Sequence, residues 1–208
     1  MNSYIAIIDY GLGNIESVKN SLHALGYKSK VSADFDVLNN AAALILPGVG
    51  AYDIAMQNIV EKKLDVVIKD LAISNKKPII GICLGMQLLA DDSEENGFHK
   101  GLGLIEGSIK RIVLPEQYKV PHVGWNKVVN RDSSDLYTRV SPGSNFYFDH
   151  SYHFECDEKF ISGTVDYGKG ITASVERENI YGVQFHPEKS QTAGLKLLRS
   201  FFSKYITQ

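Results

Sequence analysis

The sequence lacks the features that would place it in a membrane, outside the cell or on nucleic acid. Only two of its 208 residues are cysteines, Cys83 and Cys156, and no basic-then-apolar leader begins the chain, so we expect a cytoplasmic protein with reduced thiols. No apolar run approaches the roughly 20 residues that cross a bilayer. A formal net charge of -2 provides no basic surface for nucleic acid or anionic lipid. We therefore expect no membrane and no nucleic-acid partner.

Apolar runs alternate with helical patterns in the first half of the chain. The apolar runs span residues 3–9, 42–48 and 77–83, and the helical patterns span 15–25 and 51–73. We expect Asn14 to cap the first of these helices and Gly26 to end it. Strands that alternate with helices predict an open, mostly parallel sheet with helices on both faces.

The second half of the chain is rich in β-branched and aromatic residues. We expect strands joined by hairpins at residues 107–114, 125–130, 145–154, 160–168, 170–176 and 180–186. A final helix is expected over residues 194–206, with a core face made by Leu195, Leu198, Phe202 and Tyr205. The whole chain, residues 1–208, is predicted to form a single three-layer α/β domain with an antiparallel β extension.

The segment Gly-Ile-Cys-Leu-Gly at residues 81–85 matches the nucleophile-elbow pattern G-x-[S/C]-x-G. A nucleophile on a tight strand-to-helix turn needs small neighbours, and glycines stand two residues on either side of Cys83. The start of a helix also favours the thiolate. Because buried cysteines are common, the pentapeptide alone leaves Cys83 as either a packing residue or a nucleophile.

Two glycine-containing turns follow apolar runs. The segment GLGN at residues 11–14 does not complete the dinucleotide pattern G-x-G-x-x-G, because Ser17 occupies the third glycine position. We interpret it as a tight turn. The segment LPGVG at residues 46–50 is either an ordinary turn or a loop whose N–H groups, around Val49 and Gly50, face a negative oxygen.

A cysteine nucleophile needs a base and a group that orients the base. Among six histidines, His186 is the best candidate, because GVQFHPEKS places it at the end of an expected strand, at the same sheet edge as Cys83. We expect Pro187 to keep the backbone extended, so that Glu188 reaches the imidazole from the same side. A zinc deaminase would need a following P-C-x-x-C motif, which the sequence lacks, and we predict no metal.

Five motifs in a fixed order carry a family resemblance. PGVG, GICLGMQLL, PHVGWN, HSYHF and GVQFHPEKS resemble those of class I glutamine amidotransferases, and more narrowly those of the glutaminase subunits of imidazole glycerol phosphate synthases. The resemblance implies a flavodoxin-like fold, no cofactor, and a Cys-His-Glu triad that falls on Cys83, His186 and Glu188.

The resemblance also implies where the substrate, L-glutamine, is bound. The implied oxyanion hole lies at Val49, Gly50 and Leu84, and the implied glutamine-binding residues are Gln87, Glu95, Ser151 and Tyr152. Glu95 would pair with the α-amino group, although it also belongs to the charged run DDSEE, which is typical of a solvated surface. The backbone of Ser151 and Tyr152 would bind the α-carboxylate.

The chain shows no machinery for an ammonia acceptor, so the ammonia must pass to another polypeptide. The resemblance implies a heterodimer with a (β/α)8-barrel cyclase, which uses ammonia to form imidazole glycerol phosphate and an aminoimidazole carboxamide ribotide. The implied interface positions are Asn14, Trp125, Tyr147 and Lys189. Trp125 could equally be a core residue.

Three other functions stay open at this point. The segment from Tyr147 onward is also similar to a paralogous branch that supplies ammonia to an N-sugar amidotransferase of surface-polysaccharide assembly, and Asp149 stands where a small apolar residue is usual. A cysteine peptidase or deglycase shares the elbow, but Gln87 and the His-Pro-Glu run argue against it. A non-catalytic partner module would keep only the fold, and the complete triad argues against that.

Overall fold

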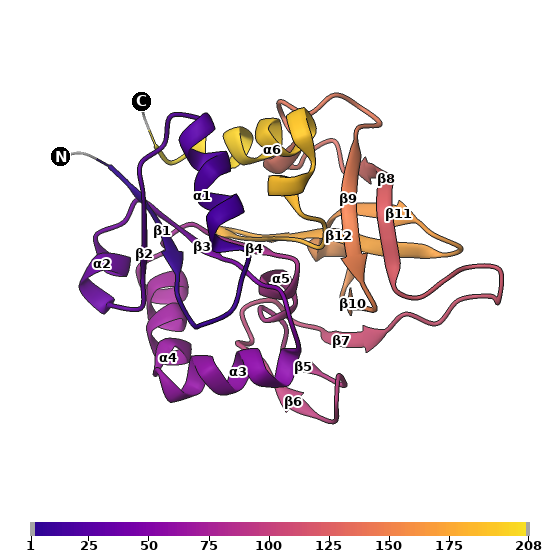
Figure 1. Ribbon diagram of the computed structural model, residues 1–208, viewed down its shortest axis with the longest axis horizontal. Coiled ribbons are helices and arrows are strands. Elements are labelled where there is room, and N and C mark those ends of the chain that lie inside the picture. Colours follow the sequence, from indigo (N-terminus) through magenta and orange to yellow (C-terminus); the bar gives the residue numbers. More distant parts are fainter. Residues whose placement is uncertain (1–2, 207–208) are drawn as a thin grey trace.

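A nine-stranded sheet forms the middle layer of the molecule, and helices cover both of its faces (Figure 1). The computed structural model describes residues 3–206. In spatial order the strands are β2 (Ser29–Ser32), β1 (Ile5–Ile8), β3 (Ala43–Leu46), β4 (Ile79–Ile82), β13 (Ile180–Val183), β12 (Gly170–Arg177), β11 (Ile161–Asp166), β8 (His122–Asn130) and β9 (Asn145–His150). The first five are parallel and the rest are antiparallel. The predicted α/β class with an antiparallel extension is confirmed.

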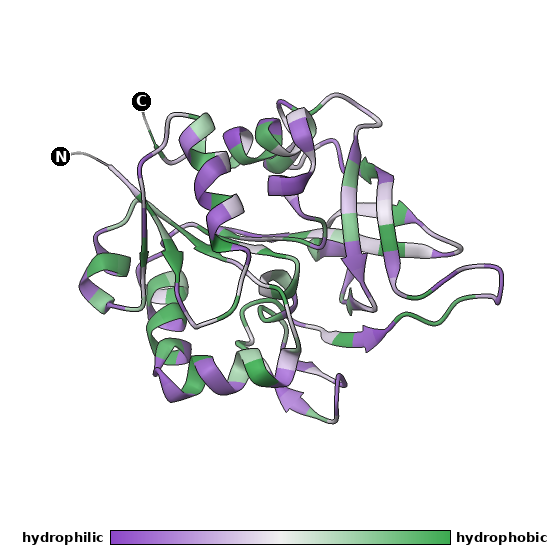
Figure 2. Ribbon diagram, in the orientation of Figure 1, coloured by the Kyte–Doolittle hydropathy of each residue, from purple (hydrophilic) through white to green (hydrophobic). Residues whose placement is uncertain are grey.

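The parallel half of the sheet is the core of the molecule. Every residue of β1, β3, β4 and β13 is buried, as expected for parallel strands that are covered on both faces. One hydrophobic cluster fills each face. Figure 2 shows these apolar strands in green between helices that carry both hydrophilic and hydrophobic residues.

The helices lie on the two faces of the sheet as the alternation predicts. Two lie on one face, α1 (Ile15–Ala24) and α6 (Gln191–Ser203); four lie on the other, α2 (Phe35–Asn39), α3 (Tyr52–Glu61), α4 (Leu64–Lys69) and α5 (Leu84–Gln87). The single helix predicted over 51–73 is wrong. Lys63 adopts a left-handed φ of 57° that separates α3 from α4, and a π-helical turn, Asp70–Ser74, follows α4.

The buried stripe of α6 differs from the predicted one. Leu198 and Phe202 are buried as expected, but Leu195 and Tyr205 are only partly buried. Leu197 and Phe201 are buried beside them, so the helix presents a wider face to the sheet than a narrow i, i+3, i+4 stripe.

A second, four-stranded sheet was not expected. Its order is β10 (Tyr152–Glu155), β7 (Ser108–Arg111), β5 (Asp92–Ser93) and β6 (His99–Lys100). The strand predicted over 145–154 is therefore divided, because the chain passes at Ser151 from the large sheet to the small one. The expected hairpin order also fails here, since β7 pairs with β10 and β13 pairs in parallel with β4.

The strands β4 and β13 place the site. They are neighbours with Ile82 opposite Val183, so both end at the same edge of the sheet, where ligands of open α/β sheets bind. Within residues 3–206, no helix has both the length and the apolar character required to cross a membrane.

Candidate active site

Cys83 lies on a tight turn between β4 and α5. Its backbone has φ 53° and ψ −110°, a left-handed conformation that costs a non-glycine residue about 1–3 kcal/mol. Its N–H donates to the carbonyl of Val183 at 2.8 Å, so the turn begins directly after the last paired residues of β4 and β13. The predicted helix start is confirmed, but α5 has only four residues, which limits its effect on the thiol to the N–H groups of one turn.

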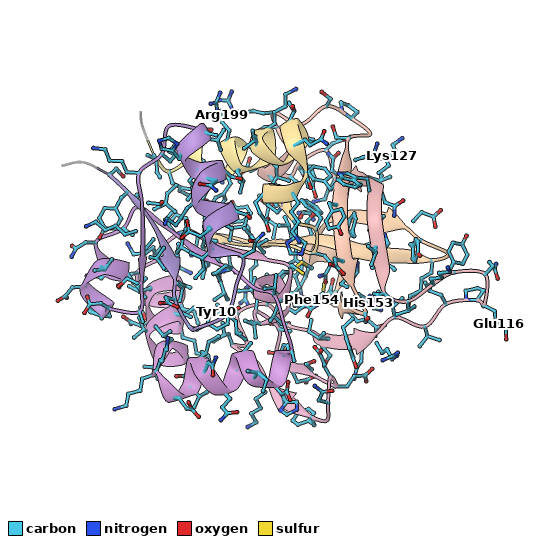
Figure 3. All side chains as sticks on the ribbon, in the orientation of Figure 1. Tyr10, Glu116, Lys127, His153, Phe154 and Arg199 are labelled. Carbon is cyan, nitrogen blue, oxygen red and sulfur yellow. The ribbon has the colours of Figure 1, made fainter. Side chains whose placement is uncertain are left out.

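Close packing requires the glycines on either side of this turn. A Cβ at Gly81 would overlap the carbonyl of Gly85, and a Cβ at Gly85 would overlap the carbonyl of Leu46 at the end of β3. The turn is therefore packed directly against the glycine loop that follows β3. Tyr10, labelled inside the molecule in Figure 3, holds that loop through a 2.6 Å hydrogen bond from its hydroxyl to the Pro47 carbonyl.

His186 and Glu188 form a buried pair next to this turn. Nδ1 of His186 lies 2.8 Å from Oε1 of Glu188, and the two side chains are 3% and 1% exposed. The predicted extended backbone is wrong: residues Pro187–Lys189 form a 3-10 turn, and this turn brings the carboxylate to the imidazole. Asn14 precedes α1 as expected, but its side chain does not cap the helix. Its Nδ2 donates instead to Glu188 Oε1 at 3.2 Å.

His186 has a raised pKa. Burial is the largest influence and acts to lower it, but hydrogen bonds to Cys83 and Glu188, together with the charges of these two groups, outweigh burial and raise the pKa to about 10. The imidazole is therefore protonated at neutral pH. A protonated imidazole beside a thiol stabilises the thiolate and holds a proton that can pass to a leaving group.

A pocket of about 390 Å³ opens beside Cys83. It is lined by Val49, Gly50, Cys83, Leu84, Gln87, Glu95, Arg111, Pro121, Asp149, His150, Ser151, Tyr152, His186 and Lys189. The structure thus gathers around one cavity all the residues expected to act in catalysis, oxyanion binding or glutamine binding, except Glu188, which contacts His186 instead. A larger cavity of about 840 Å³ lies at α1 and β2, but its lining contains no cysteine, and its one carboxylate, Glu16, pairs with Lys19.

The pocket wall offers free backbone donors. Within residues 3–206, the N–H groups of Val49, Gly50 and Leu84 donate no hydrogen bond. They belong to the glycine loop after β3 and to the first position of α5. The side chain of Glu95 contacts the first residue of α3: its Oε2 accepts a hydrogen bond from the N–H of Tyr52 at 3.4 Å. Burial raises the pKa of Glu95. This carboxylate therefore has a structural contact as well as a place in the pocket.

The comparison with known families agrees with this geometry. A family model described as glutamine amidotransferase class-I matches residues 6–205. The chain belongs to the class-I glutamine amidotransferase family.

Individual relatives cover almost the whole amidotransferase chain. It is 44% identical over 198 residues to "Imidazole glycerol phosphate synthase subunit HisH 2" of Vibrio vulnificus (strain YJ016), covering 95% of this chain and 92% of that protein. It is 46% identical to "Imidazole glycerol phosphate synthase subunit HisH" of Moorella thermoacetica (strain ATCC 39073 / JCM 9320), covering 95% and 93%. The solved "Structure of PurLQS from Thermotoga maritima" aligns with a TM-score of 0.77 at 18% identity, covering 98% and 99%, and shows the fold alone.

Gln184, which also belongs to this amidotransferase site, was not predicted from the sequence. The fully buried Gln184 directs its Nε2 to Cys83 Sγ at 3.7 Å, and its Oε1 accepts from Gln87 Nε2 at 3.0 Å. The same Nε2 of Gln87 donates to the carbonyl of Tyr152 at 3.2 Å. The available signal was spacing, because Gln184 stands two residues before His186 within the strand predicted over 180–186.

The positions expected at a partner interface lie beside the pocket. Trp125 is 55% exposed, which excludes the core alternative, and its ring packs against Tyr147 with centroids 4.8 Å apart. Nζ of Lys189 lies 5.4 Å from the centre of the Tyr147 ring. Val123, also on β8, is exposed as well. In the part of the chain that the structure describes, no group of three or more His, Cys, Asp or Glu side chains is arranged to hold a metal ion.

Proposed function

We propose that this protein is the glutaminase subunit of an imidazole glycerol phosphate synthase. It hydrolyses L-glutamine to L-glutamate and ammonia, and a (β/α)8-barrel cyclase bound as a heterodimer uses the ammonia in histidine biosynthesis. The observation that carries the hydrolysis is the buried His186, which bonds to Glu188 and Cys83 beside the pocket. The names of the relatives, at 44% and 46% identity, support the acceptor. We expect the reaction to take place in the cytoplasm without a cofactor.

The proposed chemistry begins with attack by the Cys83 sulfur on the side-chain amide carbon of glutamine. The resulting oxyanion is held by the free N–H groups of Leu84 and of the glycine loop at residues 49–50. When the C–N bond breaks, His186 gives its proton to the departing nitrogen, which leaves as ammonia. His186 then removes a proton from water, which attacks the thioester and releases glutamate.

The pocket supports the assignment of glutamine as the substrate. Glu95 supplies a negative charge for the α-amino group, and the backbone of Ser151 and Tyr152 supplies donors for the α-carboxylate. Gln87 also lines the pocket, and its amide is already bonded to Tyr152 and Gln184. We assign Gln87 to shaping the pocket through these two bonds.

The proposed partner surface consists of Val123, Trp125, Tyr147 and Lys189. Cross-strand pairing places Trp125 opposite Tyr147 and Val123 opposite Asp149 on the outer face of β8 and β9. Exposed aromatic residues of this kind often dominate the affinity of protein interfaces. Asn14, also expected at the interface, lies next to this surface through its contact with Glu188.

Substitution of Cys83 tests the proposal. In a complex with the cyclase of the same organism, Cys83→Ala should abolish product formation from glutamine and leave product formation from added ammonium salt unchanged. Cys156→Ala is the matched control, because it removes the other thiol and should leave both reactions intact. Glutamine-driven product formation by Cys83→Ala would show that another residue is the nucleophile.

The same complex separates the remaining functions. A complex with the cyclase that makes imidazole glycerol phosphate from glutamine favours the histidine pathway over sugar amidation. Labelling of Cys83 by diazo-oxo-norleucine, a glutamine-analogue electrophile, favours a glutaminase over a peptidase or a non-catalytic module, since neither of these needs a glutamine site.

A further inference from the structure

Two buried histidines face each other at the wall of the glutamine pocket, which His150 lines. His122 and His150 are direct cross-strand partners on β8 and β9, which brings their side chains together on the inner face of the sheet. Nδ1 of His122 lies 2.9 Å from Nε2 of His150. The two residues are 0% and 6% exposed, and nothing in the proposed chemistry uses either ring as an acid or a base.

The surroundings keep both rings uncharged. The ring of His122 is stacked between Phe148 and Tyr167, with centroids 4.6 Å and 4.1 Å away. Burial lowers the pKa of His122 to about 4 and, with smaller contributions from neighbouring histidines, the pKa of His150 to about 3. A neutral imidazole has one donor and one acceptor, so the partners of each ring determine which nitrogen holds the proton.

Those partners allow only one arrangement of protons. Nδ1 of His150 lies 2.8 Å from the carbonyl oxygen of Tyr152, and a carbonyl only accepts, so this nitrogen carries the proton. Nε2 of His150 must then accept from Nδ1 of His122. That leaves Nε2 of His122 as an acceptor, and Nδ2 of Asn126 donates to it at 2.7 Å. Every donor in the series points from Asn126 toward Tyr152.

The series ends at the backbone that borders the pocket. The carbonyl of Tyr152 receives His150 Nδ1 and also Gln87 Nε2 at 3.2 Å. The carbonyl of Ser151 is held separately, by the N–H of Ile112 at 2.9 Å. In a strand the N–H and C=O of one residue lie on the same edge, so fixing the Tyr152 carbonyl also fixes the direction of its N–H. Figure 3 labels the next two residues of β10, His153 and Phe154.

We propose that His122 and His150 are positioning residues for glutamine binding, which hold the Ser151–Tyr152 backbone in place through a directed series of hydrogen bonds from Asn126. This inference rests on the proposed glutaminase function. The series begins on β8 beside the exposed Trp125, so it also connects the outer strands of the large sheet with the wall of the pocket.

Two substitutions of His150 separate this role from simple structural support. His150→Asn keeps an amide donor near the Nδ1 position and loses the acceptor for His122. His150→Gln keeps an acceptor near the Nε2 position and loses the donor to Tyr152. Each variant breaks one of the two buried hydrogen bonds, so a purely structural role predicts similar effects of both.

The measurement is the rate at which diazo-oxo-norleucine labels Cys83 in the full chain, followed by mass spectrometry over a range of reagent concentrations. We expect His150→Gln to raise the half-saturating concentration about tenfold or more, with a smaller change in the limiting rate. His150→Asn should stay within about threefold of the wild type. If both variants shift the half-saturating concentration equally, or neither does, the inference is wrong.

Two further results keep the outcomes distinct. If diazo-oxo-norleucine does not label the wild-type protein, the proposed glutaminase function is overturned, and this inference with it. If it does label the wild-type protein, the comparison of the variants tests the inference alone. If His150→Gln does not fold, the ring tautomers of the wild type decide the question through long-range ¹H–¹⁵N NMR correlations. Both histidines should carry the proton on Nδ1, and a proton on Nε2 of His150 would overturn the inference.

Discussion

The left-handed backbone conformation of Cys83 leads us to a prediction about the free energy of unfolding, and this prediction does not depend on the proposed function. An L-residue at φ 53°, ψ −110° is strained by about 1–3 kcal/mol, and glycine relieves that strain because it has no Cβ. We therefore compare Cys83→Ala with Cys83→Gly. Both remove the sulfur, so the difference between them reports on the backbone and on one buried methyl group.

Cys156 is the matched control. Its φ lies outside the left-handed region, so Ala→Gly there has only the usual cost of about 0.5–1 kcal/mol for the more flexible unfolded chain, plus up to about 0.8 kcal/mol for a lost methyl contact. Cys156→Gly should therefore be less stable than Cys156→Ala by about 1 kcal/mol. At Cys83 the same costs are offset by the relief of strain, so Cys83→Gly should be at least as stable as Cys83→Ala.

The quantity to measure is the difference between the two comparisons, about 1–3 kcal/mol in favour of glycine at position 83. Urea denaturation of the four variants measures it, and calorimetry should show a corresponding shift of roughly 2–4 °C per kcal/mol in a chain of this size. An equal loss of stability at both positions would show that the elbow is not strained.

Three further predictions concern the proposed site. Glu188→Gln keeps the contact with His186 but removes the negative charge that helps to raise the pKa of His186 to about 10. The reaction needs the protonated imidazole, which is lost as pH rises through this pKa. The alkaline limb of kcat/KM for glutamine should therefore move down by about 1–2 pH units. Glu95→Gln should raise KM for glutamine by about tenfold or more with little change in kcat, whereas a loss of stability with unchanged KM would mean that Glu95 only contacts α3. Trp125→Ala should weaken cyclase binding by about 2 kcal/mol, as measured by calorimetry. Val129 is a similarly exposed residue of β8, and Val129→Ala should leave cyclase binding unchanged. Equal effects of the two substitutions would place the interface elsewhere.

The sequence predicted best those elements whose pattern reflects burial. The strands β1, β3 and β4 are continuous apolar runs because both of their faces are covered, and each was located within a few residues. The edge strand β2, Ser29–Ser32, was missed because three of its four residues are polar and none of the four is buried. Residues 145–154 were read as one strand because strand propensity cannot tell which sheet a residue joins, and the chain changes sheets at Ser151.

The site shows the same division between local and tertiary information. The turn at Cys83 was predictable because it requires residues without a Cβ two positions before and after the cysteine, and the sequence has Gly81 and Gly85 there. The approach of Glu188 to His186 was predicted for the wrong reason, because a 3-10 turn replaces the extended backbone. Gln184 was missed because its spacing to His186 does not indicate what the amide contacts, and those contacts are made only when β4 and β13 become neighbours.

Residues of the expected partner surface are bonded directly to the triad, which has a mechanical consequence. Asn14 was expected at the interface, yet its side chain bonds to Glu188. Tyr147 presents its ring to Trp125 while its carbonyl accepts the N–H of His186. A cyclase bound on this face would therefore press on side chains that contact, or are bonded through the backbone to, the proposed base and its carboxylate. Because each of these hydrogen bonds joins an interface residue directly to His186 or Glu188, displacement of Tyr147 or Asn14 would act on the pair itself, and no longer pathway through the core is required.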